Sequence, residues 1–291
     1  MNTQKSNETK SKISLVLAMI IFGTIGIFVK RIPLSSGIIA GVRGLVGAGF
    51  LYLFTLIKKG SLSQKAIINN LKILIWSGIL IGANWIFLFE SYSYTTIATA
   101  TLCYYLAPVF IILMSSIFLK ENLTLKKIIC ILIALIGMIF VSGVFKGGLD
   151  ISQIKGVLYG IAAAVLYASV IILNKKLKNI DAYDMTIVQL AVAGFTVLPY
   201  AMFSGKIIKG NISSAGIIFL ILIAIVHTGI CYAIYFGAIK NLKAQTAAIF
   251  SYIDPVVAIF LSSILLNEKM DTYGIIGAIL ILGATFISEM K

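Results

Sequence analysis

An apolar segment occurs twice in this sequence, and the duplication constrains the fold more than any other feature. The first copy covers residues 95–121 and the second covers residues 242–268. With an offset of 147 residues and no gap, the copies share a Thr, a Tyr, a Pro, a Ser-Ser pair and a final Glu: Thr99 and Thr246, Tyr105 and Tyr252, Pro108 and Pro255, Ser115-Ser116 and Ser262-Ser263, Glu121 and Glu268. The chain is therefore predicted to be two copies of one unit, residues 13–143 and 156–289.

Long apolar runs predict that both copies lie in a membrane. Of the 291 residues, 60% are hydrophobic and 12% are charged, whereas a soluble domain carries about 25% charged residues. A run of roughly 18 or more apolar residues is long enough to cross a hydrocarbon core of about 30 Å. The sequence thus predicts an all-α polytopic membrane protein. Its ten predicted transmembrane helices cover residues 13–29, 36–57, 73–93, 96–119, 126–143, 156–175, 184–204, 215–239, 243–266 and 272–289.

Lys and Arg are unequally divided between the two ends of the predicted helices. With the N-terminus on the inner side, the inner segments hold sixteen of these residues and the outer segments hold seven. Because cytoplasmic loops are enriched in Lys and Arg, both termini are predicted to be cytoplasmic. The net charge of +14 is then attributed to topology and lipid headgroups, and no nucleic-acid partner is expected.

An odd number of crossings in each copy turns the second copy upside down relative to the first. Inverted repeats are typical of secondary transporters, in which the two halves exchange conformations and so alternate access between the two sides. A channel or a membrane enzyme can also contain repeats, but it has less need of the inversion.

No motif predicts an enzyme, a metal site or a cofactor. The sequence has no metal-ligand spacing, no nucleophile elbow and no P-loop. The cysteines Cys103, Cys130 and Cys231 lie in apolar helices, where small packing roles are expected. The first apolar run continues to Val29 without a small-residue cleavage site, so it is interpreted as an uncleaved first helix.

The repeated unit also resembles a known family. It has a Thr/Ala-rich start, a mid-helix Pro, a Ser-Ser pair, a terminal Glu and a following Gly/Ala-containing helix, and Arg43 fits the same pattern. In these features it resembles the ten-helix EamA family of the drug/metabolite transporter (DMT) superfamily, over residues 13–142 and 156–289. The resemblance implies that helices one to four and six to nine surround a central cavity, with helices five and ten at the periphery. It also implies a family in which many members export amino acids or other small metabolites.

Four ionisable residues lie well inside apolar helices: Arg43, Glu90, His227 and Asp254. A charge that faces lipid at the bilayer centre costs about 2.5 kcal/mol or more, so these side chains are expected to face protein or water. At the 147-residue offset none of them has an ionisable equivalent in the other copy. The repeated fold therefore does not require them, which favours functional roles.

Their depths divide these residues into two pairs. Arg43 and Glu90 lie in the outer third, where an ion pair would satisfy both, as a structural pair, an outer gate or a clamp for a substrate carboxylate. His227 and Asp254 lie near the midplane, and Asp254 directly precedes Pro255, which can loosen the helix. A midplane carboxylate at a helix irregularity is typical of a coupling-ion or substrate site. For His227, a hydrogen-bonded packing role is the alternative.

Aromatic residues within the crossings are predicted to line the same cavity. Trp85 and Tyr232 are equivalent at the 147-residue offset, as are Tyr105 and Tyr252. Such rings could stack on a planar or cationic substrate, although core packing must account for some of them.

These features predict a secondary transporter of the cytoplasmic membrane. Its expected substrate is a small amphipathic metabolite, an amino acid or an organic cation, which is exported with protons as the candidate coupling ion. Import of such a metabolite is the alternative direction. A non-transporting scaffold or lipid-binding subunit is the rival class, and it would leave Asp254 without a purpose.

Overall fold

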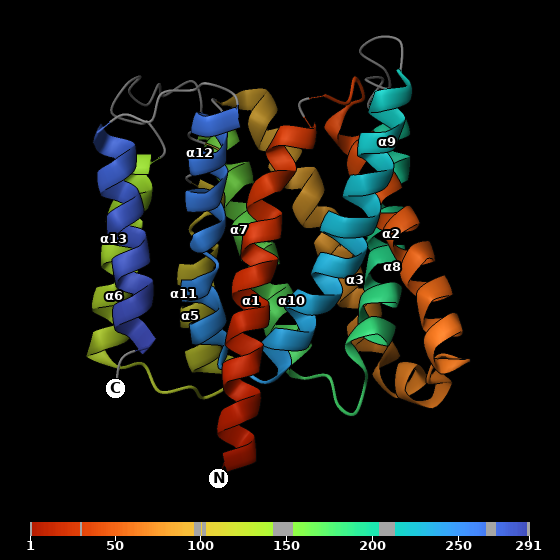
Figure 1. Ribbon diagram of the computed structural model, residues 1–291, viewed down its shortest axis with the longest axis horizontal. Helices are drawn as coiled ribbons and strands as arrows, with labels where there is room; N and C mark the ends of the chain where they lie inside the picture. Colours follow the sequence, from red (N-terminus) through yellow and green to blue (C-terminus); the bar gives the residue numbers. More distant parts are fainter. Residues whose placement is uncertain are drawn as a thin grey trace.

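The structure, a computed structural model, describes residues 2–29, 31–95, 100, 103–141, 154–203, 213–265 and 272–289. Its regular elements in these ranges are helices, as the sequence predicted (Figure 1). The first half contains α1 (Asn2–Val29), α2 (Ser36–Lys59), α3 (Gln64–Tyr94), α5 (Ala107–Phe118) and α6 (Leu125–Val141). The second half contains α7 (Ile154–Lys175), α8 (Ala182–Phe203), α9 (Ser214–Leu222), the π-helix η3 (Ile223–Ile230), α10 (Cys231–Lys240), α11 (Ala244–Phe250), α12 (Ile253–Leu265) and α13 (Thr272–Glu289).

Several helices are long and apolar enough to cross a membrane. By length and composition, six stretches of the described chain qualify: Asn7–Val29, Ser36–Lys59, Gln64–Tyr94, Ile154–Lys175, Ala182–Phe203 and Ser214–Lys240. Shorter apolar helices occur at Ala107–Phe118 and Ile275–Ala284. The chain is thus a multi-pass membrane protein, while the count of ten crossings stays a prediction.

The helix bounds repeat at the offset found in the sequence. Shifted by 147 residues, α1 falls on α7, α2 falls on α8, α3 falls on the continuous stretch α9–η3–α10, α5 falls on α12 and α6 falls on α13. The contacts between helices repeat as well. The pair α3 and α7 corresponds to α10 and α1, and the pair α5 and α7 corresponds to α12 and α1, and all of these pairs are in contact.

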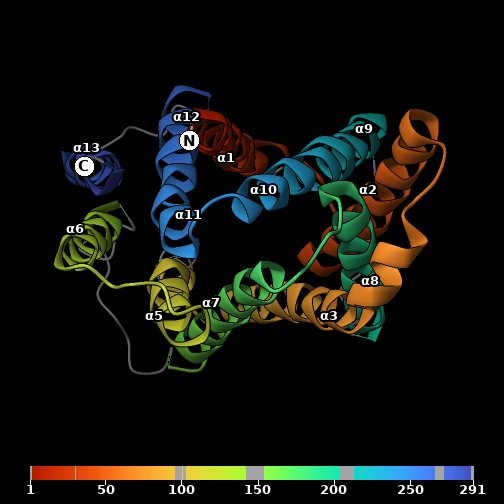
Figure 2. The same cartoon turned by 90° about the horizontal axis from the view of Figure 1, so that it is seen from below.

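The helices form a ring with one pair set apart from it. Seen from the end that carries the N-terminus, α1, α10, α8, α3, α7, α5 and α11 follow one another around the ring, and α6 and α13 lie together outside it (Figure 2). The resemblance implied this peripheral place for the fifth and tenth helices.

Small residues let the two halves approach closely where α2 crosses α8. A Cβ atom added to Gly44 would lie 3.2 Å from the Cα of Gly194 and 3.2 Å from the carbonyl oxygen of Leu190. This is the close packing through small residues that is common between membrane helices.

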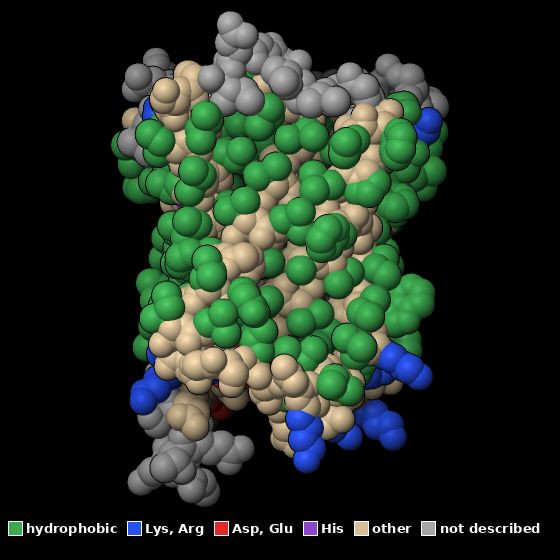
Figure 3. All heavy atoms as spheres, turned by 90° about the vertical axis from the view of Figure 1, so that its right-hand side faces the viewer, with side chains coloured by type: hydrophobic (Ala, Val, Ile, Leu, Met, Phe, Trp, Pro, Cys, Tyr) green, Lys and Arg blue, Asp and Glu red, His purple; other side chains and the backbone are tan. Residues whose placement is uncertain are grey.

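The surface is divided into an apolar band and a basic end. Hydrophobic side chains cover the face formed by α2, α3 and α8, and Lys and Arg gather mainly at the end near the N-terminus (Figure 3). The predicted hinge at residues 144–155 lies outside the described residues except for residues 154 and 155, and Glu268 lies outside them too.

Candidate functional site

A cavity of about 480 Å³ lies inside the ring. The residues that line it come from both halves: Met19, Phe22, Gly23, Ile25, Arg43, Trp85, Leu88, Phe89, Tyr92, Tyr104, Tyr105, Ala107, Pro108, Tyr167, Tyr232, Tyr235, Ser251, Asp254 and Ala258. Within this lining one residue, Arg43, is basic and one, Asp254, is acidic. Of the eight predicted site residues, five line the cavity: Arg43, Trp85, Tyr105, Tyr232 and Asp254.

Asp254 stands at the break between two helices. The helix α11 ends at Phe250 and α12 begins at Ile253, so the predicted single helix over residues 243–266 is interrupted. Pro255 follows Asp254 and has no backbone N–H, so it is suited to the first turn of α12. The first half has an equivalent break, because α5 begins at Ala107 with Pro108 in its first turn.

The neighbouring helix α1 passes very close to Asp254. A Cβ atom on Gly23 would lie 2.8 Å from the carbonyl oxygen of Asp254 and 2.7 Å from the Cβ of Val257. Glycine at this position therefore allows α1 to close one side of the cavity next to the carboxylate.

Arg43 projects from α2 and is held by two neighbours. Its Nε donates a hydrogen bond to Thr228 Oγ1 at 2.9 Å. Its guanidinium carbon lies 5.1 Å from the centre of the Trp85 ring, within the range of a cation–π interaction. A guanidinium has five N–H donors, and Nε accounts for one of them. Among the described residues, no acceptor is found for the other four.

Thr228 belongs to the π-helix η3, and this explains its position. In η3 the Thr228 hydroxyl donates to the carbonyl oxygen of Ile223 at 3.1 Å, five residues earlier. The hydroxyl oxygen of Thr228 also accepts a hydrogen bond from Arg43 Nε, so the irregular turn presents an acceptor to α2. Short π-helical segments in longer helices are frequent at functional sites.

Aromatic rings form the walls between the two charged residues. Tyr232 makes edge contacts with Phe22, at 5.2 Å between ring centroids, and with Trp85, at 6.3 Å. On the side nearer the N-terminal end, the hydroxyl groups of Tyr167 and Tyr235 are hydrogen-bonded to each other. The cavity thus combines apolar ring faces with two charges of opposite sign.

The ion pair predicted between Arg43 and Glu90 is wrong. Glu90 accepts a hydrogen bond from the Tyr200 hydroxyl of α8, and Arg43 is bound to Thr228 and Trp85. Their similar depth along the helices suggested the pair, but depth does not fix the direction in which a side chain points around each helix. Glu90 does not line the cavity.

His227 and Tyr252 also lie outside the cavity lining. His227 Nε2 shares a hydrogen bond of 2.7 Å with Thr24 Oγ1 of α1, and the ring packs against Phe28. Tyr252 is fully buried against Cys130, Ala134 and Ile281, on the side of the peripheral pair α6 and α13. These contacts favour packing roles for both residues.

Hydrogen bonds cross-link the two halves between the segment that follows α5 and the start of α11. The Glu121 carboxylate, which follows α5, accepts hydrogen bonds from the backbone N–H groups of Ala244 at 2.9 Å and Gln245 at 3.3 Å. Lys127 Nζ donates to Gln245 Oε1 at 2.6 Å. These bonds lie at the end of the bundle near the N-terminus. At the opposite end Tyr92, close to the end of α3, lines the cavity and is exposed.

The fold and this cavity define a polytopic helical membrane protein with an internal cavity lined by two similar halves. The chain belongs to the EamA-like transporter family, whose sequence pattern matches residues 9–143 and again residues 154–290. It is 29% identical over 281 residues to the uncharacterized transporter YxxF of Bacillus subtilis, covering 96% of this chain and 89% of that protein. An uncharacterized transporter of Archaeoglobus fulgidus is 23% identical over 280 residues, covering 94% of each chain.

A solved crystal structure has the same fold. It superposes with a TM-score of 0.83 at 16% sequence identity, covering 97% of this chain and 96% of the other. The match to the family's sequence pattern confirms the family resemblance inferred from the repeated segment.

Sequence reasoning missed Thr228 and Tyr200, the partners of Arg43 and Glu90. Each lies in a largely apolar helix, and because neither residue is charged, neither was singled out as a polar site residue. The proline next to Tyr200, at position 199, was the one signal near it. The π-helix around Thr228 has no signal in the sequence.

Proposed function

We propose that this member of the family is a secondary transporter that exports a small amphipathic metabolite, an amino acid or an organic cation, by alternating access. Family membership supports a membrane transporter of a small molecule. The substrate class, the direction and the mechanism are the proposal. No catalytic role, metal or cofactor is included in it.

The observation that carries the proposal is the pair of unmatched charges in the cavity. Arg43 retains N–H donors without acceptors in the described chain, and the Asp254 carboxylate has no hydrogen bond or ion pair there. A buried or half-buried charge is unfavourable unless a partner offsets it. A ligand with a carboxylate and an amine would satisfy both residues, and the aromatic walls would contact its apolar part.

The repeated architecture supports alternating access. Five helices in one half correspond to their equivalents in the other at one constant offset, and the cavity is lined by both halves. In an inverted repeat, an exchange of conformations between the halves moves the opening from one side to the other. In the state described by the structure, the Glu121 cross-link joins the two halves at the end near the N-terminus.

The proposed location is the cytoplasmic membrane, with both termini in the cytoplasm. The excess of Lys and Arg at the N-terminal end supports this orientation. In this orientation the structure would describe the outward-facing state of the transporter, from which an exported substrate leaves.

A flux experiment with a matched pair of substrates tests the proposal. Purified protein in liposomes is screened with amino acids, with the amines that lack their carboxylate, and with organic cations, each with and without a pH gradient. Arg43→Gln is expected to weaken transport of the carboxylate-bearing substrate and to spare its amine analogue. Equal loss for both analogues would contradict a carboxylate-binding role of Arg43. Absence of flux for every compound in the wild type would support the scaffold alternative, and uptake by whole cells would support import.

A further inference from the structure

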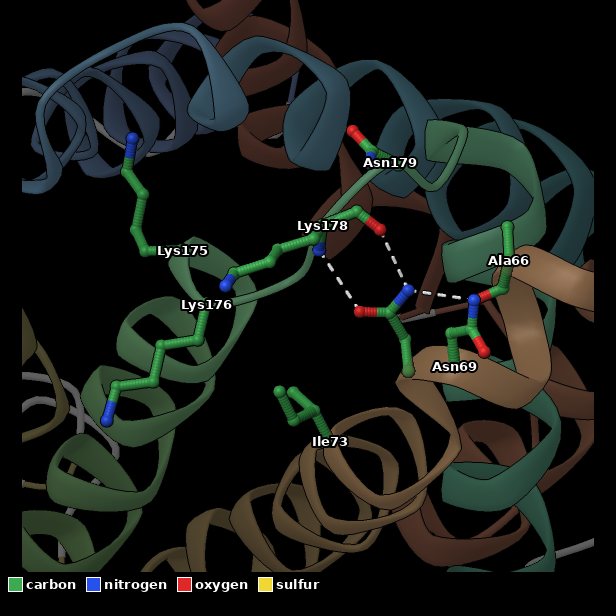
Figure 4. Close-up of a pocket in the computed structure, with 8 residues that line it drawn as sticks. Ala66, Asn69, Ile73, Lys175, Lys176, Lys178 and Asn179 are labelled. Atoms are coloured by element: carbon green, nitrogen blue, oxygen red, sulfur yellow. Dashed lines mark hydrogen bonds between the residues drawn. The ribbon is translucent and has the colours of Figure 1, made fainter.

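A second pocket lies at the end of the bundle near the N-terminus, outside the central cavity. Its volume is about 720 Å³, and it is formed by the first turns of α3 and the end of α7 (Figure 4). The lining residues are Ala66, Asn69, Asn70, Ile73, Lys175, Lys176, Lys178 and Asn179. Three of these are lysines and none is acidic, so the pocket has a net positive charge.

The loop that carries these lysines is fixed to α3 by one buried side chain. The amide nitrogen of Asn70 donates to the carbonyl oxygens of Lys178 at 2.9 Å and Ala66 at 2.8 Å, and its Oδ1 accepts from the backbone N–H of Lys178 at 3.0 Å. Asn70 is 6% exposed. Both backbone groups of Lys178 are therefore held in place, as the dashed lines in Figure 4 show.

Packing then leaves the charged side chains of the loop outside. Leu177 and Ile180 are buried at 7% and 2% exposure, whereas Lys176, Lys178 and Asn179 are exposed. Lys175 is different, since its ammonium donates to the carbonyl oxygens of Ile239 and Leu242 at the end of α10. Lys176 and Lys178 are thus the two lysines available to a ligand.

Neither of these two lysines has an acidic partner among the described residues. The acids nearest in the chain are otherwise engaged. Asp181 forms an ion pair with Lys59 at 2.9 Å, and the Asp184 carboxylate accepts a hydrogen bond from the backbone N–H of Ser63 at 3.2 Å. A positive pocket without a counter-charge attracts an anion.

The pocket lies at the boundary between the basic end and the apolar band. On α3, exposed apolar residues occur close to the lining, among them Ile68 at 68% exposure and Trp76 at 62%. On α5, Phe118 is 55% exposed, and the Lys176 ammonium lies 5.7 Å from the centre of its ring. An anion in the pocket can therefore be continuous with an apolar chain that lies against the bundle.

From this arrangement we infer that the pocket binds the phosphate headgroup of an anionic phospholipid from the leaflet at the N-terminal end. Lys176 and Lys178 contact the phosphate, and the acyl chains lie along the exposed apolar residues of α3 or α5. Basic pockets between helices on the cytoplasmic side are suited to such headgroups. The inference does not depend on which substrate the central cavity carries.

Binding of short-chain lipids to the full-length protein tests the inference. Protein in a neutral detergent is titrated with dioctanoyl phosphatidylglycerol, dioctanoyl phosphatidylcholine and inorganic phosphate, and bound adducts are quantified by native mass spectrometry. The wild type is expected to bind the anionic phosphatidylglycerol in preference to the zwitterionic phosphatidylcholine. Lys176→Gln/Lys178→Gln should weaken this binding by about fivefold per lysine, or about 25-fold in total.

A matched control variant removes two positive charges from the same end of the bundle, near the N-terminus. Lys65 and Lys72 are exposed on α3 and do not line the pocket. Lys65→Gln/Lys72→Gln should bind the lipid like the wild type, and Lys176→Arg/Lys178→Arg should restore binding. Equal loss in the pocket and control variants would overturn the inference in favour of general surface charge. Equal binding of inorganic phosphate would overturn the lipid as the source of the anion, and absence of selective lipid binding would overturn the site itself.

Discussion

The Nε of Arg43 donates a hydrogen bond to Thr228 Oγ1 over 2.9 Å, and this bond joins α2 of the first half to the π-helix of the second. It fixes the guanidinium next to Trp85, so the charge is positioned before any ligand arrives. Such preorganisation reduces the ordering that ligand binding requires.

Replacing the threonine tests this relationship. Thr228→Val keeps the shape but removes the hydroxyl, leaving Arg43 Nε without its acceptor. A hydrogen bond to a charged group inside a membrane protein contributes about 1–2 kcal/mol, so thermal unfolding of the purified protein should show a loss of this size. Thr228→Ser keeps the hydroxyl and is expected to behave like the wild type. Unchanged stability in the valine variant would contradict the role given to this bond.

The sequence was sufficient for the fold because the repeat is a property of the chain itself. Pro108 and Pro255 mark equivalent helix breaks, and the constant offset pairs the helices without any knowledge of their contacts. The cavity was partly predictable for the same reason. Asp254 stands beside its proline, and Trp85 and Tyr232 are a repeated pair in contact.

The partners of individual polar groups were not predictable. Glu90 pairs with Tyr200 because of the rotation of α3 about its own axis, and residue spacing along one helix does not define that rotation relative to α8. His227 turns toward Thr24 of α1 for a comparable reason, since it lies in a π-helical segment that shifts the helical phase.

Two double-mutant cycles should distinguish the observed pair, Glu90 and Tyr200, from the pair predicted from the sequence, Arg43 and Glu90. Glu90→Gln and Tyr200→Phe are expected to be non-additive in stability, with a coupling energy above about 0.5 kcal/mol, because the two side chains are hydrogen-bonded. The effects of Arg43→Gln and Glu90→Gln on the free energy of unfolding should add to within about 0.5 kcal/mol, because the two side chains share no partner. Coupling between Arg43 and Glu90 would contradict the partners described here.

Loosening the Glu121 cross-link should shift the protein toward the state that is open at the N-terminal end. Glu121→Ala removes the acceptor for the N–H groups of Ala244 and Gln245. Loss of about 1.5 kcal/mol for a hydrogen bond to a charged group corresponds to about a tenfold shift in population. Labelling of a Ser251→Cys reporter from the N-terminal side should rise by this factor. Glu121→Gln keeps an oxygen acceptor, so its labelling should lie between that of the wild type and that of Glu121→Ala. Unchanged labelling in the alanine variant would contradict a gating role.

The orientation can be tested with single exposed cysteines. The native cysteines are buried, so an impermeant thiol reagent has a low background. Asn122→Cys, between α5 and α6, should be labelled from the cytoplasmic side, and Ser214→Cys, at the start of α9, from the external side. Both positions are exposed. External labelling of the Asn122→Cys variant would reverse the proposed topology.

The central claim is that Asp254 carries either the coupling proton or the amine of the substrate. The equivalent residue in the first half is Ala107, so the repeated fold does not require a carboxylate there. Asp254→Asn keeps the side-chain shape but cannot bind or release a proton or form an ion pair with an ammonium group. Asp181→Asn, a carboxylate outside the cavity, is the control, and loss of its exposed ion pair has a small effect, up to about 1 kcal/mol.

Gradient-driven flux in liposomes, measured for the wild type, Asp254→Asn and Asp181→Asn at equal amounts of folded protein, tests this claim most directly. We predict that Asp254→Asn folds normally and abolishes gradient-driven flux, while Asp181→Asn transports like the wild type. Substrate binding then separates the two roles, because it is retained if Asp254 carries the proton and lost if Asp254 holds the amine. Normal flux with an unchanged pH profile in Asp254→Asn would contradict the account.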